Sequence, residues 1–373
     1  MTSAALPVIT NLINGQKSFF STLQTSNLPF RLEMLKSLKT AVLKYEKKIA
    51  DALWTDLHKS YEEAYLTEIS IVLKEIDNHI RHLKRWAKPK RVRTPLILFP
   101  STSRIIYEPL GTALIMAPWN YPFQLLINPL IGAISAGCCA ILKPSPYAQA
   151  TAQVIDEMIS KSFSPEYIGI VQGGREINKI LLEQRFDFIF FSGSPSLGKL
   201  VMKAAAEHLT PVVLELGGKS PCIVDKSANI KIAAKRIAWG KTVNAGQTCI
   251  APDYVFVHES LHDDLLREIS VQIMKMYGPV IRESRHYPRI INQNAVERLQ
   301  KLMLHGEIVF GGEVIPEEKY ISPTLIKGVK PEYPVMNEEI FGPILPFLTF
   351  SDISEVISYL DSNEKPLAFY YFG

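Results

Sequence analysis

The first ninety residues carry a helical pattern of apolar positions. Between residues 66 and 83 the apolar side chains recur at steps of three and four, which places them on one face of a helix. The run is shorter than three heptads, so we expect a helix packed on a domain rather than a coiled coil. The apolar stripe consists of Leu66, Ile69, Leu73, Ile76, Ile80 and Leu83.

Beyond residue 107 the pattern changes to short apolar runs separated by amphipathic stretches. Runs that are apolar on both faces, with helices between them, are typical of parallel strands. We therefore predict an α/β fold, with a doubly wound parallel sheet and a second α/β domain. Ligands of such sheets bind beyond the carboxyl ends of the strands. The strand-like runs are residues 112–118, 139–144, 168–173, 186–193, 211–218 and 254–258.

The stretch 125–142 contains no charged residue and is long enough to be a candidate membrane span. It includes Asn128-Pro129 and two glycines, and it ends at Lys143-Pro144. We interpret it as a buried helix of small residues followed by a strand.

The segment between the helical region and the sheet is strongly basic. Residues 81–93 could form a nucleic-acid patch. We favour a solvated helix end followed by an exposed connection, because cations complement the carboxyl end of a helix and no nucleic-acid-binding motif accompanies them. Residues 94–109 follow, and we expect two short strands there around a Pro-Ser turn. This hairpin-like arm, residues 87–106, is a candidate for subunit contact.

The composition is that of a folded protein. Hydrophobic residues make up 47% of the chain and charged residues 21%, which excludes intrinsic disorder. A net charge of +4 is too small to indicate a polyanion binder. Four cysteines without a Cys-x-x-Cys pair exclude a disulfide scaffold and argue against a zinc ribbon. The start, MTSAALPVIT, lacks the features of a secretory signal. We predict a cytoplasmic protein with no metal, no nucleic-acid partner and no membrane span.

A strand, a glycine-bounded turn and a helix over residues 190–200 form the first candidate site. Gly193, Ser194 and Gly198 lie at this turn, where a ligand can approach the backbone and a new helix offers N–H groups to a phosphate. Residues 193–199 spell GxxxxGK, but Leu200 stands where a P-loop needs Ser or Thr. A phosphate site, a P-loop-like hydrolase and a plain strand-to-helix turn all remain open on the motif alone.

Three further residues could carry chemistry. Cys249 follows a Gly-Gln-Thr turn that could present its thiol to a cleft, although a buried inert cysteine fits equally well. Glu215 is a carboxylate among apolar residues at a strand end, which suits a general base; the alternative is an acid turned to solvent or paired with Lys219. Asn120 lies in the stiff segment PWNYP, where a fixed amide could stabilise an oxyanion or simply form a turn.

Taken together, these segments resemble the aldehyde dehydrogenase superfamily. The likeness is greatest to its class 3 branch, which acts on aromatic and medium- to long-chain fatty aldehydes. It covers nearly the whole chain and is specific because PWNYP, LELGGKSP, GQTC and EEIFGP occur together in this order. The resemblance implies an NAD(P)-binding domain from residues 1–86 and 107–212, an oligomerisation arm at 87–106 and a catalytic domain at 213–373.

The resemblance also implies a role for each matching residue. Cys249 matches the nucleophile, Glu215 the general base and Asn120 the oxyanion-binding amide, which works with the Cys249 backbone N–H. The cofactor, NAD or NADP, is expected at residues from both domains. These residues are Gly193, Ser194 and Gly198 of the cofactor turn, Lys143 near the adenosine ribose, Glu339 at the nicotinamide ribose, and its neighbour Phe341.

The implied reaction oxidises an aldehyde to a carboxylic acid. The Cys249 thiolate adds to the carbonyl, the hemithioacetal passes hydride to the nicotinamide, and the thioester is hydrolysed by water that Glu215 activates. Pro146 stands where the family pattern usually has a glutamate that bonds the adenosine ribose. We therefore expect NADP to be accepted at least comparably with NAD.

Relatives in this family continue beyond the position of Gly373. The resemblance therefore implies that this chain lacks a C-terminal segment that helps to close the aldehyde pocket and to build a homodimer. We expect the chain to bind cofactor better than it turns over aldehyde. A truncated, inactive cofactor-binding homologue is the main alternative.

Overall fold

The computed structural model describes residues 2–373, with side chains from residue 5 onward, and the chain divides into two compact units. The first unit contains the residues up to Ala52 together with Ala64–Glu215, and the second contains Leu53–Glu63 and Leu216–Gly373. The division differs from the expected ranges mainly because residues 53–63 group with the second unit. The functional domain assignment remains a prediction.

The amino-terminal region is helical, as expected. Its main helices are α1 (Thr2–Ser21), α2 (Leu28–Leu57), α3 (Tyr61–Ala64) and α4 (Ser70–Trp86). A π-helical turn, η2 (Tyr65–Ile69), precedes α4. A π-turn takes up one more residue than an α-turn and shifts the phase of the apolar stripe. The stripe prediction is therefore wrong at its start: Leu66 is 58% exposed, whereas Ile69, Ile76 and Leu83 are buried.

The π-turn directs Glu68 into the interior of the first unit. Its Oε2 accepts hydrogen bonds from the backbone N–H groups of Phe123 (2.9 Å) and Gln124 (3.1 Å). These groups lie at the start of α5 (Gln124–Ala136), where a helix terminus favours a negative charge. The buried carboxylate thereby anchors the loop that leads from the sheet into α5.

The first unit is built on a five-stranded sheet with the order β5-β4-β3-β6-β7. The strand pairs β3–β4, β3–β6 and β4–β5 are parallel, and the direction of the chain's winding reverses between β3 and β6. This is the doubly wound topology that the apolar runs predict. The strands are β3 (Thr112–Met116), β4 (Cys139–Lys143), β5 (Ile168–Ile170), β6 (Phe188–Gly193) and β7 (Val212–Leu216).

Helices pack against this sheet. α1 and α5 contact β3 and β4, while α6 (Gln149–Ser162) contacts β5 and α8 (Pro195–Ala206) contacts β6. A further helix, α7 (Arg175–Leu182), lies between β5 and β6 in the chain. The expectation of burial on both faces fails at β7, an edge strand whose residues alternate between half-buried and exposed.

The second unit contains a six-stranded sheet with the order β10-β13-β14-β9-β8-β15. Its neighbours pair in parallel except for β10 and β13. α9 (Ile230–Thr242) and α10 (His262–Tyr277) pack together. The second unit also contains α11 (Gln293–Leu302), α12 (Pro334–Asn337) and α13 (Ile353–Asp361). The strands are β8 (Pro221–Val224), β9 (Tyr254–His258), β10 (Glu307–Phe310), β13 (Thr324–Lys327), β14 (Ile344–Phe350) and β15 (Tyr370–Phe372).

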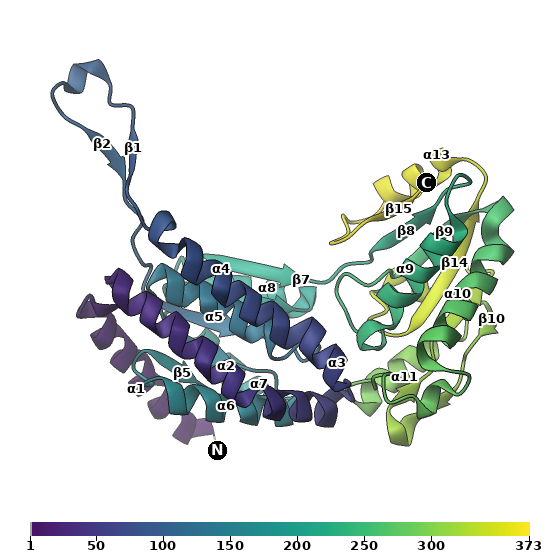
Figure 1. Cartoon of the computed structure of the whole chain (residues 1–373), viewed down its shortest axis with the longest axis horizontal. Helices are drawn as coiled ribbons and strands as arrows, with labels where there is room; N and C mark the ends of the chain where they lie inside the picture. Colours follow the sequence, from purple (N-terminus) through teal and green to yellow (C-terminus); the bar gives the residue numbers. More distant parts are fainter. Residues whose placement is uncertain (1) are drawn as a thin grey trace. The chain divides into compact units, whose positions relative to one another are not determined.

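The hairpin-like arm extends from the first unit (Figure 1). β1 (Lys90–Val92) pairs antiparallel with β2 (Ser103–Ile105). The predicted position of the first strand is wrong, because that strand lies in the basic run, and Leu96–Leu98 forms a 3-10 turn instead. Lys90, Arg91 and Val92 are all exposed, and the branched side chain of Val92 favours an extended strand.

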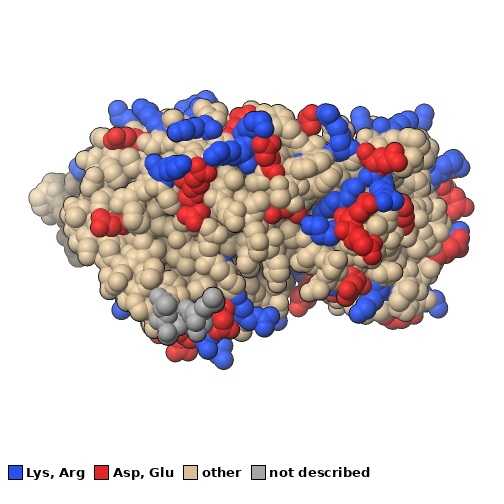
Figure 2. Space-filling model, turned by 90° about the horizontal axis from the view of Figure 1, so that it is seen from below, with Lys and Arg blue, Asp and Glu red and all other residues tan. Residues whose placement is uncertain are grey.

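The uncharged stretch 125–142 divides into α5 and β4, as the sequence analysis expects. Among the described residues, no helix combines the length and the apolar character that crossing a membrane requires. Acidic and basic side chains are interspersed on the face of the molecule in Figure 2, as is typical of a solvated surface.

Candidate active site

A cavity of about 1100 Å³ opens at the carboxyl ends of β3, β4 and β6 in the first unit. This is the point where the strand order reverses and where doubly wound sheets bind their ligands. Of the predicted cofactor residues in this unit, Lys143, Gly193 and Ser194 line the cavity. Gly198 does not: it is buried inside α8, where its N–H donates to Ser194 O.

The amino terminus of α8 faces this cavity through Ser194, Ser196 and Leu197. Ser194 is the N-cap, and its Oγ accepts from the N–H of Leu197 at 3.4 Å. A helix amino terminus at a cavity is a suitable position for a phosphate group. The P-loop reading loses its support, because Lys199 is exposed and does not line the cavity.

Lys143 ends β4 and is 2% exposed. Its Nζ donates to the carbonyl oxygen of Pro144 at 2.8 Å, and burial lowers the pKa of this lysine to about 8. A buried ammonium is stabilised by further hydrogen-bond acceptors, and a ribose hydroxyl bound in the cavity could supply one.

Several polar residues that the sequence analysis missed also line the cavity. The Ser192 hydroxyl is buried and has no hydrogen-bond partner among residues 2–373. Arg175 and Lys179 reach the cavity from α7. Ser192 could have been found from its place directly before Gly193. No sequence signal identifies Arg175 and Lys179, because only the folded arrangement of the strands and α7 brings them to the cavity.

The loop that follows β3 carries Asn120, which is 2% exposed. The loop is fixed at its far end, where Glu68 binds the first N–H groups of α5. Its neighbour Trp119 lines the cavity. The amide of Asn120 is thus held on a rigid segment next to the candidate cofactor site, within the same unit.

Glu215 lies on the edge strand β7 and is exposed. The expectation of a carboxylate desolvated by apolar neighbours is therefore wrong for this unit taken by itself. An edge strand leaves one side without a covering partner, and the alternation along β7 turns Glu215 outward. Lys219 is not its partner either, because the Lys219 ammonium binds Asp253 and two carbonyl oxygens.

The second unit carries the candidate nucleophile. All four cysteines lie in the described chain; Cys138, Cys139 and Cys222 are buried, and Cys249 alone is half-buried. Burial raises the pKa of Cys139 to about 12 and also raises the pKa of Cys222. A thiol reacts as its thiolate, so these core cysteines are unsuited to catalysis.

Three successive residues before the thiol adopt left-handed backbone angles. Asn244, Ala245 and Gly246 have φ values of 52°, 51° and 72°. Such a run is costly for residues with side chains and persists only where the surroundings hold it. A Cβ on Gly246 would lie 2.3 Å from Gly342 O, so only glycine fits there.

The side chain of Gln247 holds this loop from inside. It is fully buried, and its Nε2 donates to Asn244 O and Arg289 O, both at 3.0 Å. Its Oε1 accepts from the N–H of Ile291 at 3.0 Å. The Asn244 N–H in turn donates to Glu63 Oε1 at 2.8 Å. Sequence reasoning missed Glu63, which lies 181 positions from its partner.

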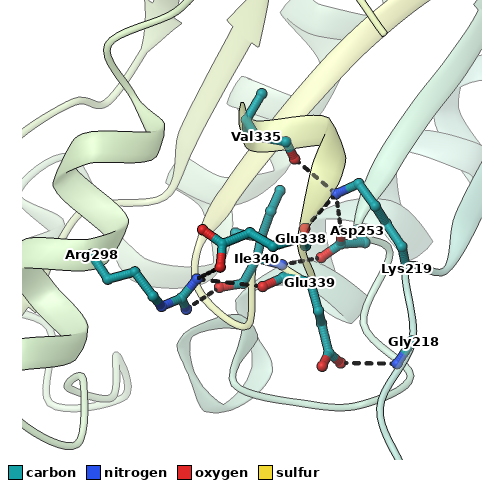
Figure 3. Close-up of polar contacts among 8 residues, drawn as sticks. All are labelled: Gly218, Lys219, Asp253, Arg298, Val335, Glu338, Glu339 and Ile340. Carbon is teal, nitrogen blue, oxygen red and sulfur yellow. Dashed lines mark hydrogen bonds and ion pairs between the residues drawn. The ribbon is translucent and has the colours of Figure 1, made fainter. Parts of the chain in front are cut away.

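Glu339 lies in a network of charged groups within the second unit (Figure 3). Its carboxylate accepts from the N–H of Gly218 at 3.3 Å, and a Cβ on Gly217 would collide with it. Burial, with the nearby negative charge of Asp253, raises the pKa of Glu339 to about 7. The next residue but one, Phe341, has a left-handed φ of 50°.

Lys219 and Arg298 fix the segment that carries Glu339 (Figure 3). The Lys219 ammonium binds Asp253, Val335 O (2.8 Å) and Glu338 O (2.9 Å). The Arg298 guanidinium donates to Ile340 O at 2.5 Å. Cations from two other parts of the chain thus determine where the Glu339 carboxylate lies.

Lys241 adds a buried cation to the same network. It is 3% exposed, and its Nζ has no hydrogen-bond partner within the described chain. Burial lowers its pKa to about 8, while Asp253 and Glu339 act in the opposite direction. No group of three or more metal-ligating side chains is found among residues 2–373.

Comparison with known proteins supports one family. The model of the aldehyde dehydrogenase family matches residues 8–373. The chain is 49% identical over 368 residues to 4,4'-diaponeurosporen-aldehyde dehydrogenase of Staphylococcus aureus (strain NCTC 8325 / PS 47), covering 98% of this chain and 80% of that protein. It is 43% identical to aldehyde dehydrogenase family 3 member A2 of Mus musculus, covering 93% of this chain and 72% of that protein.

A solved structure, the substrate-bound state of Staphylococcus aureus AldH, matches with a TM-score of 0.96 at 48% identity, over 98% of this chain and 80% of that one. An NADP-dependent enzyme of Escherichia coli shares the fold with a TM-score of 0.89 at 23% identity, over 99% of this chain and 78% of that one. The doubly wound sheet, the cavity at its switch point and these matches lead to one assignment. The chain belongs to the aldehyde dehydrogenase family and is an NAD(P)-dependent oxidoreductase that acts on aldehydes.

Proposed function

We propose that this chain oxidises its aldehyde through the thiol of Cys249. The observation that carries the assignment is that Cys249 alone among the four cysteines is accessible, on a loop held by a buried amide. In this mechanism the thiolate adds to the aldehyde carbonyl, and the new oxyanion is stabilised by the Asn120 amide and the Cys249 backbone N–H. Loss of hydride converts the hemithioacetal into a thioester on the sulfur.

Hydrolysis of the thioester completes the cycle. Glu215 removes a proton from water, the hydroxide attacks the acyl carbon, and the carboxylic acid leaves as the Cys249 thiolate is restored. Glu215 on its edge strand is exposed within its own unit, so water reaches it directly. Its assignment as base depends on the match to LELGG rather than on burial.

The residues at the cavity fit a nicotinamide dinucleotide. When bound, the nicotinamide accepts the hydride that the substrate carbon loses. Support comes from the amino terminus of α8, which offers N–H groups to a phosphate, and from the Ser192 hydroxyl, which has no hydrogen-bond partner among the described residues. Lys143 would bind a ribose hydroxyl, and Gly193 and Ser194 would contact the phosphates. Glu339, with Phe341 beside it, would hold the nicotinamide ribose as a carboxylate acceptor.

We further propose a long apolar aldehyde as the substrate and the arm as a dimer contact. The substrate proposal is supported by the name of the 49% identical relative, which specifies a diaponeurosporen aldehyde. The arm exposes Leu96, Ile97 and Phe99 almost fully, and such a surface is typical of an interface. A free catalytic thiol suits a reducing, cytoplasmic compartment.

The test is a panel of aldehydes of increasing chain length with NAD or NADP. Formation of the reduced cofactor, followed by absorbance, is expected with the wild type and is expected to disappear in Cys249→Ala. Retained turnover in Cys249→Ala would refute the thiol mechanism.

Replacement of Ile97 by Asp, followed by measurement of the molar mass in solution, tests the arm: an unchanged mass contradicts its role in dimerisation.

A further inference from the structure

We propose that Gln247 and Glu63 are positioning residues that hold the Cys249 loop in its reactive conformation. The inference rests on the proposed role of Cys249 as the nucleophile. It assigns a function to a buried amide and to a carboxylate from a distant part of the chain, and neither is required to touch substrate or cofactor.

The backbone before Cys249 has a conformation that needs external support. Asn244 and Ala245 carry side chains but have φ values of 52° and 51°, and residues with side chains are strained in this region. The cost must be offset by contacts that over-determine the loop. The geometry identifies those contacts as the hydrogen bonds that the loop and its surroundings make with the Gln247 amide and with the Glu63 carboxylate, which accepts.

Gln247 uses its amide on three backbone groups at once. Nε2 bonds the carbonyls of Asn244 and Arg289, and Oε1 accepts from the Ile291 N–H, all at 3.0 Å. The Asn244 side chain returns a bond to Gln247 O, also at 3.0 Å. Only an amide supplies two donors and an acceptor in this arrangement. The thiol loop is therefore tied to residues 289–291.

Glu63 fixes the other end of the left-handed run. Its Oε1 accepts the Asn244 N–H at 2.8 Å, and a charged acceptor strengthens such a bond. The segment that contains Glu63, residues 53–63, is also bonded to the segment that Gln247 contacts, because the Arg289 N–H donates to Leu57 O at 2.9 Å. Residues 53–63 and residues 289–291 thus form one support on which the loop is mounted.

The experiment compares Glu63→Ala, Glu63→Gln and Gln247→Met with the wild type. Glu62→Ala is the matched control, because Glu62 is the exposed neighbour of Glu63 and pairs with Arg285 rather than with the loop. Three quantities are measured: the rate of Cys249 alkylation by iodoacetamide in the cofactor-free protein, and the kcat and the KM for cofactor in aldehyde oxidation. Thermal unfolding is recorded for every variant.

We expect Glu63→Ala and Gln247→Met to slow the alkylation several-fold at neutral pH. We expect kcat to fall by about 10- to 100-fold, since small displacements of a reacting group carry penalties of this size. The KM for cofactor stays within twofold. Glu63→Gln keeps an acceptor oxygen and recovers most of the rate, and Glu62→Ala behaves as the wild type.

Wild-type alkylation and kcat in folded Glu63→Ala would overturn the inference, as would equal losses in Glu62→Ala and Glu63→Ala. A lower melting temperature with an unchanged rate of alkylation would show that the two residues support the fold only. If Gln247→Met does not fold, the Glu63 series still decides. The proposed function fails by a separate result, namely aldehyde oxidation by Cys249→Ala.

Discussion

The carboxylate of Glu339 accepts a hydrogen bond from the backbone N–H of Gly218, a residue 121 positions earlier in the chain. The two motifs that contain these residues, LELGGKSP and EEIFGP, are therefore in direct contact at 3.3 Å. Lys219 strengthens the contact, because its ammonium binds the carbonyl oxygens of Val335 within α12 and of Glu338 directly after it. Glycine at 217 leaves the space that the carboxylate occupies.

Burial of Glu339 predicts a specific dependence of stability on pH. Its pKa in the folded chain is about 7, above the ordinary value of 4.5, so the folded state binds a proton that the unfolded state has lost between these pH values. Stability therefore decreases as pH rises from about 4.5 to 7, by up to about 3 kcal/mol. Glu339→Gln removes this loss.

We expect Glu339→Gln to be as stable as the wild type or slightly less stable at pH 5, and more stable at pH 8. Urea unfolding of the cofactor-free proteins at both pH values measures the difference. Glu332→Gln is the control, because Glu332 is exposed, whereas the nearer Glu338 pairs with Arg298 at 3.5 Å. A Glu339→Gln effect that is equal at pH 5 and pH 8 would contradict a raised pKa.

Lys241 predicts the opposite dependence at alkaline pH. Burial lowers its pKa to about 8 from 10.5, so between these values the unfolded state binds the extra proton and stability rises with pH. At pH 7 the chain holds an ammonium without a hydrogen-bond partner among the described residues. We expect Lys241→Met to raise the free energy of unfolding at pH 7 by about 1–3 kcal/mol.

The gain in Lys241→Met should shrink as pH rises from 8 to 10, because the wild-type lysine then loses its charge in the folded state. Chemical unfolding across this range measures it. The exposed Lys235 of the same helix, replaced by Met, is the control and should show no such trend. A loss of stability in Lys241→Met at pH 7 would mean that the ammonium has a compensating partner.

Much of the sheet could be predicted from the sequence because a buried parallel strand leaves a local signature. Each of the six apolar runs contains a strand, including β4 with all five residues buried. The π-turn at 65–69 left no such mark, since one extra residue in a turn changes no local composition. As a result Leu66 is exposed and Glu68 is buried, the opposite of what the apolar pattern predicts.

The site could be predicted only where its chemistry is local. Cys249 comes shortly after the left-handed residues 244–246 in the chain, and the GQTC motif includes Gln247, whose side chain holds this loop. Glu63 could not be found, because its bond to Asn244 depends on residues 53–63 belonging to the second unit, which local sequence does not show. The exposure of Glu215 depends on β7 being the edge strand, which is a property of the sheet order.

Burial predicts that one cysteine reacts in the folded chain. Cys249 is half-buried, whereas the others are buried and two of them have a raised pKa. Brief treatment with iodoacetamide at pH 7.5 should label Cys249 at least about tenfold faster than any other cysteine. Peptide mass spectrometry measures the labelling. Cys249→Ser should remain unlabelled until it is denatured, and rapid labelling of Cys138 or Cys222 would contradict the packing.

The cavity predicts tolerance of the phosphate that distinguishes NADP from NAD. A dinucleotide fold that prefers NAD places an acid near the ribose 2′-hydroxyl, and an arginine there accommodates a 2′-phosphate. The wall after β4 contains Pro146 rather than an acid. Elsewhere the same cavity is lined by Arg175 and Lys179 and also by Glu183 and Glu207. We therefore expect kcat/KM for NADP to equal or exceed that for NAD.

Pro146→Glu should reverse the preference, because a carboxylate accepts bonds from ribose hydroxyls and repels the 2′-phosphate. A change in the ratio on the order of tenfold, equivalent to about 1.4 kcal/mol, is expected. Arg175→Met should weaken NADP and leave NAD within about twofold, a difference that only a contact with the extra phosphate produces. Equilibrium binding of NADH and NADPH by fluorescence separates this effect from turnover. Equal losses for both cofactors in Arg175→Met would place the arginine away from the 2′-phosphate.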